Sequence, residues 1–82
     1  MTNTAWTSLS DLESGERAVV RQLRGGREFT SRLAALGFTV GAEIVVIQNY
    51  DHGPITVSVR GTRIALGRGE AIKVLVEVKR ET

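Results

Sequence analysis

Two stretches of the sequence place a β-branched apolar residue at every second position. In residues 55–60, Ile or Val alternates with Thr, Ser or Arg. In residues 72–79, Ile or Val alternates mostly with Lys and Glu. A side-chain period of two is typical of a strand with one buried face, whereas a helix repeats every 3.6 residues. Val and Ile together fill 15 of the 82 positions, and both fit a pleated surface better than a helix. The pattern predicts a small, mostly β protein.

Five strands are expected, over residues 16–23, 43–48, 55–60, 63–66 and 72–79. Nine Gly stand against one Pro, which favours tight turns between strands, and Gly61-Thr62 has the length of a two-residue hairpin loop. Residues 67–71 are expected to form a turn with room for one helical turn. Five short strands with a helix on one side favour a partly open five-stranded barrel, because closure hides most of the sheet edge.

One short helix is expected to be inserted among the strands, at about residues 28–36. Phe29, Leu33 and Leu36 are spaced to share one helical face. Gly37 follows at the position where a left-handed glycine ends a helix, and Phe38 could supply the accompanying apolar contact. A helix of about nine residues is stable only when it docks on something.

The length allows one domain, for which we expect residues 7–80, preceded by a flexible lead-in of residues 1–6. A helical turn is expected near the N-terminus, between Leu9 and Gly15. No apolar stretch approaches the roughly 20 residues that cross a bilayer, and residues 1–6 lack the parts of a secretory signal. We therefore expect a cytoplasmic protein that is not inserted in a membrane.

Composition excludes several kinds of site. The sequence contains no Cys, which excludes a disulfide, a thiolate nucleophile and a Cys-ligated metal. The single histidine, His52, follows Asp51 in a Gly-Pro turn. These two side chains make at best a weak metal site shared between molecules, and a solvated turn is the simpler interpretation. Because no nucleophile or convergent polar cluster accompanies His52, we expect neither an enzyme nor a cofactor.

Arginines form two groups, one in residues 21–32 and one in residues 60–68. The net charge of +2 is too small to indicate nucleic acid by itself. Of the four aromatic side chains, only Tyr50 is placed to stack on a base. A protein-contact surface explains the arginines at least as well, so we expect no nucleic-acid partner. Nucleic-acid binding by a small barrel stays open as an alternative.

Three blocks of the sequence resemble the FeoA family. They are residues 9–16, residues 32–46, beginning Arg32-Leu33-Ala34-Ala35-Leu36-Gly37-Phe38, and residues 59–71. Their order and spacing agree over roughly residues 7–78. The resemblance implies an SH3-like barrel with a helical insertion, acting as a cytoplasmic accessory protein of bacterial ferrous iron uptake. It implies contact with the permease FeoB, either its cytoplasmic region or its membrane part. Family descriptions also attach transition-metal binding, so a metal-binding or sensing module is an alternative.

An accessory protein of this kind needs a contact surface, which we expect at the helix and its exit. Arg32, Leu36 and Phe38 are the candidates there, with Arg60 and Arg63 near the predicted hairpin. Three glycines, Gly37, Gly41 and Gly61, are expected to serve backbone conformation rather than contact. We expect a monomer or a weak homo-oligomer that its partner recruits to the inner face of the membrane.

Overall fold

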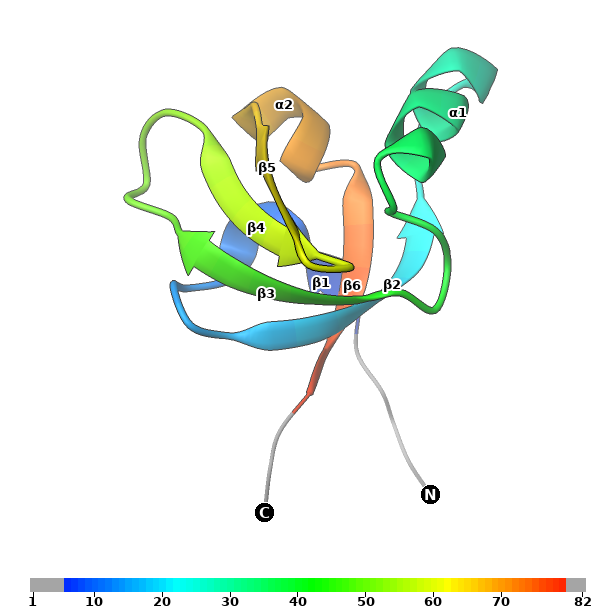
Figure 1. The fold of residues 1–82 in the computed structure, drawn as a ribbon. Coiled ribbons are helices and arrows are strands. Elements are labelled where there is room, and N and C mark those ends of the chain that lie inside the picture. Colours follow the sequence, from blue (N-terminus) through cyan, green and yellow to red (C-terminus); the bar gives the residue numbers. More distant parts are fainter. Residues whose placement is uncertain (1–5, 80–82) are drawn as a thin grey trace.

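The computed structural model describes residues 6–79, which form one curled sheet with two short α-helices (Figure 1). The helix expected at 28–36 and the helical turn expected near the N-terminus are both present. In chain order the elements are β1 (Thr7–Ser8), η1 (Leu9–Asp11), β2 (Arg17–Leu23), α1 (Arg27–Ala35), β3 (Glu43–Gln48), β4 (Ile55–Val59), β5 (Thr62–Leu66), α2 (Arg68–Ala71) and β6 (Val74–Lys79). The expected lead-in lies outside the described residues except for Trp6, and so does residue 80.

All strands of the described chain belong to one antiparallel sheet with the order β1-β6-β2-β3-β4-β5. The register shifts between Val20 and Gln22 in β2, and between Val46 and Gln48 in β3. Irregularities of this kind bend a strand and increase its twist, so they help the sheet to curl into a partly open barrel.

Three details of the predicted strands were wrong. The described sheet has six strands, because the two residues of β1 pair with β6 and are too few to show an alternating pattern. The hairpin loop is Arg60-Gly61, since Val59 pairs directly with Thr62. The last strand begins at Val74 rather than Ile72, because Ile72 keeps helical dihedral angles at the end of α2.

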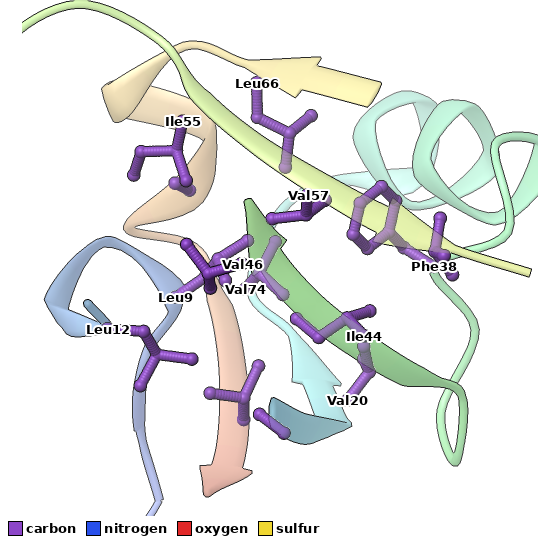
Figure 2. Close-up of a cluster of buried hydrophobic side chains, with 14 of the residues drawn as sticks. Leu9, Leu12, Val20, Phe38, Ile44, Val46, Ile55, Val57, Leu66 and Val74 are labelled. Carbon is purple, nitrogen blue, oxygen red and sulfur yellow. The ribbon is translucent and has the colours of Figure 1, made fainter. Parts of the chain in front are cut away.

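The core fills the inside of the curled sheet (Figure 2). The inward-facing residues of the strands supply most of it, with η1, α1, α2 and the loops completing it. No polar or charged side chain is buried in the described part of the chain. The buried residues are Leu9, Leu12, Ala18, Val20, Leu33, Phe38, Ala42, Ile44, Val46, Ile55, Val57, Val59, Leu66, Ala71, Val74 and Val76.

Candidate functional site

Helix α1 ends in a Schellman motif that turns the chain back into the core. The N–H of Phe38 donates to the carbonyl of Leu33 over 2.9 Å, and the N–H of Gly37 donates to the carbonyl of Ala34 over 2.9 Å. Gly37 has φ +105°, a conformation that costs any other residue steric energy. Phe38, at the position where the motif makes its apolar contact, is fully buried, as is Leu33.

Phe38 is therefore not a surface residue, and its expected role in partner contact was wrong. The reversal at Gly37 directs its ring into the cluster with Val20, Ile44 and Val57 instead (Figure 2). Contact with a partner and packing in the core are both compatible with the sequence at Phe38. The direction of the chain after Gly37 decides between them.

Two apolar side chains on the connection from α1 to β3 remain exposed. Leu36, at the end of the helix, is 43% exposed. Val40 is 66% exposed in a turn closed by a 2.9 Å hydrogen bond from the N–H of Ala42 to the carbonyl of Thr39. The two residues lie on either side of the buried Phe38 along the same short connection.

Arg60 brings a positive charge from the β4–β5 hairpin to this connection. Its Nη2 donates to the hydroxyl of Thr39 over 3.3 Å. Its Cδ lies 3.3 Å from the position that a Cβ on Gly37 would occupy, so the aliphatic part of Arg60 lies against the end of the helix. Within residues 6–79 its guanidinium contacts no carboxylate. We call Leu36, Val40 and Arg60 the exit-turn surface.

The other two arginines of the predicted site lie elsewhere. Arg32 forms an ion pair with Glu70 of α2 and lies 6.0 Å from the centre of the Phe29 ring. Arg63 is exposed as the second residue of β5, directly across from Ser58. The structure thus brings Leu36 and Arg60 together, while Arg32 connects the two helices and Arg63 occupies a sheet edge.

The comparisons with known proteins agree with one another. The model of the FeoA domain matches residues 7–78. The chain belongs to the FeoA family. A curated relative from Methanocaldococcus jannaschii, named "Putative Fe(2+) transport protein A", is 36% identical over 69 residues, which cover 84% of this chain and 83% of that protein.

Solved structures confirm the SH3-like small barrel expected of a FeoA protein. The crystal structure of an iron uptake regulatory protein (FeoA) has a TM-score of 0.87 at 35% identity, covering 92% of this chain and 100% of that one. A manganese-dependent transcriptional repressor has a TM-score of 0.84 at 16% identity, over 96% of this chain and 45% of that one. At that identity, the similarity to the repressor shows the fold alone.

In this FeoA-family chain, the loop between β3 and β4 carries Asp51 and His52. Both side chains are exposed. Nowhere in residues 6–79 do three or more His, Cys, Asp or Glu side chains gather as a metal site would require. The described residues also include no helix long and apolar enough to cross a membrane.

Asn49, which sequence patterns did not indicate, joins several parts of the described chain through its side-chain amide. Its Nδ2 donates to the carbonyls of Ser10 and Leu12 over 3.2 and 2.7 Å. Its Oδ1 accepts from Nη2 of Arg68 over 2.7 Å and from the N–H of Asp51 over 3.1 Å. The only sequence signal was the tendency of Asn to occupy turns, which does not reveal partners so distant in the chain.

Charges in this FeoA domain are unevenly distributed. Among the described residues, Arg68 of α2 and Lys73 have no carboxylate partner. Arg24, Arg27, Arg60 and Arg63 have none either, and these four lie on α1, the connection before it, or the β4–β5 hairpin and β5. Glu28 is the one carboxylate in those segments. Elsewhere in the sheet, Lys79 binds Glu43 over 2.7 Å and lowers the pKa of that carboxyl by hydrogen bond and charge.

Proposed function

We propose that this protein is a non-enzymatic accessory protein of ferrous iron uptake, which works in the cytoplasm by contacting the permease FeoB. Membership of the FeoA family supports the pathway. The observation that carries the contact role is the exit-turn surface, where Leu36 and Val40 are exposed on the connection that Arg60 contacts at Gly37 and Thr39.

The exit-turn surface has the chemistry of a protein contact. Burying apolar area stabilises a complex by about 25 cal/mol per Å², and Leu36 and Val40 have that area free. Arginine is enriched at the centres of interfaces because it combines apolar packing with directed hydrogen bonds. The Schellman motif holds the surface in a defined shape through Leu33 and Phe38, so little conformational entropy is lost on binding.

Binding of the full chain to the purified cytoplasmic domain of FeoB tests the proposal. We expect saturable binding by calorimetry, measured with and without guanine nucleotide to show which state is recognised. Leu36→Asp is expected to weaken binding by about tenfold or more, because it places a charge where an apolar side chain is buried. Since Leu36 is half exposed, the variant should melt at nearly the same temperature as the parent chain.

Ile72→Asp is the matched control. Ile72 is 56% exposed at the end of α2, so this variant carries the same substitution on a different element and should bind like the parent. Equal loss in both variants would contradict the exit-turn surface as the contact. Absence of binding to the domain and to the full-length permease in detergent would contradict the proposed function.

A metal-linked role is the competing hypothesis, and it makes a different prediction. A ligand that binds only the folded state raises its stability. We expect the melting temperature to stay unchanged with excess ferrous ion or zinc, and a saturable rise would favour the metal-binding alternative.

A further inference from the structure

Strand β5 is an open edge of the sheet. It is last in the strand order, and in the described chain its backbone pairs with β4 alone. Its five residues run without a register shift and contain neither Gly nor Pro. The opposite edge strand, β1, has only two residues. Because a long, regular edge is a template for pairing with another chain, β5 is the edge of this barrel suited to accept a strand.

The hairpin determines which backbone groups of β5 are free. Both loop residues of Arg60-Gly61 have positive φ, +52° and +81°, the form of two-residue loop in which Val59 and Thr62 close the hairpin as a hydrogen-bonded pair. Hydrogen-bonded pairs then alternate along the strands. The first, third and fifth residues of β5 therefore bond to β4, and Arg63 and Ala65 direct their N–H and C=O groups away from the sheet.

The side chains at this edge indicate the charge of the incoming strand. Arg63 and Ala65 are both exposed, and from β4 through β5 the sequence has no carboxylate. A strand paired at Arg63 would place one of its own side chains next to the guanidinium, where an opposite charge stabilises and a like charge destabilises. Ala65 is small and leaves room for a larger neighbour. Arg60, at the hairpin, adds a second cation beside the exit-turn surface.

We infer that β5 binds an extended, acidic segment of a partner protein as an added strand, through the backbone of Arg63 and Ala65 and the charge of Arg63. The backbone hydrogen bonds supply affinity and the guanidinium selects the segment, a recurring mode of peptide recognition. This inference deepens the contact role proposed above and rests on it for its biological meaning. It makes its own physical prediction, which can be tested without FeoB.

The test uses the full chain, labelled for NMR, and a blocked peptide in which Glu and Val alternate. We expect saturable shifts centred on β5, together with slower hydrogen exchange at the amides of Arg63 and Ala65. Slowed exchange at those two amides is the direct signature of strand addition, because contact with side chains alone leaves the amides open to water. A peptide with Lys in place of Glu should bind about tenfold more weakly or worse.

Two variants separate the parts of the inference. Arg63→Glu should reverse the preference between the Glu and Lys peptides. Ala65→Pro removes one free N–H and leaves the hydrogen bonds to β4, since Pro is tolerated at a sheet edge with its nitrogen facing outward. This variant should abolish peptide binding, whereas the control Ala65→Ser should not. If Ala65→Pro fails to fold, as judged by its amide spectrum, the inference is tested by whether Arg63→Glu reverses the preference between the two peptides.

Three results would overturn the inference. They are the absence of saturable shifts, shifts without protection of the Arg63 and Ala65 amides, and equal affinity for the two peptides. A self-association that grows in Arg63→Val without any peptide binding would mean that Arg63 only keeps the edge from pairing with other copies. The peptide experiment contains no FeoB, so a negative result there does not contradict the proposed function. In the same way, absence of binding to FeoB does not contradict peptide binding at β5.

Discussion

Asn49 joins three separate parts of the chain through one side-chain amide. It binds the carbonyls around η1, the guanidinium of Arg68 on α2, and the backbone of its own loop at Asp51. We expect Asn49→Ala to lower the free energy of unfolding by about 1–3 kcal/mol, because two partly buried carbonyls lose their donor. Denaturant unfolding measures the change, and Gln48→Ala, whose side chain binds only the exposed Tyr50 hydroxyl, is the control.

That control should change stability by no more than about 0.5 kcal/mol, as surface substitutions usually do. Similar losses in the two variants would mean that the network around Asn49 contributes no more than an exposed contact. Single residues of this kind are the least accessible to sequence reasoning. The turn preference of Asn places it in the loop, but its distant partners follow only from the folded chain.

At the scale of a single element, helix α1 shows what the spacing of apolar residues can predict and what it cannot. The spacing of Phe29, Leu33 and Leu36 predicted a shared face, and the helix does form. A straight helix on a curved barrel touches it over only part of its length, so only Leu33 is buried, while Phe29 is half-buried and Leu36 exposed. The spacing could not show which of the three reaches the core, nor that Phe38 joins Leu33 there.

Leu33 is therefore expected to hold the helix to the barrel. Leu33→Ala should cost about 2–5 kcal/mol of unfolding free energy, because a fully buried side chain is lost and a cavity remains. Leu36→Ala should cost less than about 1 kcal/mol, since its side chain is already partly hydrated. Denaturant unfolding of both variants measures the difference. Equal costs would contradict the arrangement of α1 seen here.

Strands β4 and β6 follow from β-branched residues at every second position, because one buried face selects them, although the start of β6 was placed two residues too early. Strand β3 was expected from the continuous apolar run of residues 44–47. The hairpin was misplaced by one residue because Arg60 adopts a positive φ that its residue type does not favour. Of the predicted contact residues, sequence could name chemical types, but the direction of Phe38 and the separation of Arg32 from Arg60 depend on the three-dimensional path.

At the scale of the whole molecule, the charges without an ion-pair partner in the described residues are unevenly distributed. In residues 6–79, Arg24, Arg27, Arg60 and Arg63 have no carboxylate partner and belong to the segments around α1 and β5. Arg68 of α2 also has none, and it binds the carbonyl of Gly53 and the Oδ1 of Asn49 at the β3–β4 loop. Of the carboxylates without a cation partner in residues 6–79, Asp11, Glu13, Glu16 and Asp51 lie at η1, the loop after it and the β3–β4 loop, and Glu28 lies on α1. Figure 1 shows α1 on the opposite side of the barrel from the β3–β4 loop. Such a distribution orients an anionic partner before contact, even at a net charge of only +2.

The rate of association with the FeoB domain should therefore fall as salt is added. Screening acts beyond about 8 Å at physiological ionic strength, so it slows the approach of a charged partner far more than it speeds dissociation. Stopped-flow measurements should show a several-fold lower association rate for the double variant Arg24→Glu, Arg27→Glu, with a nearly unchanged dissociation rate. The double variant Asp11→Asn, Glu13→Gln, which removes two negative charges away from α1, should associate at least as fast as the parent. An association rate that does not respond to salt would mean that the arginines act only in short-range contacts, and that the uneven charge has no part in finding the partner.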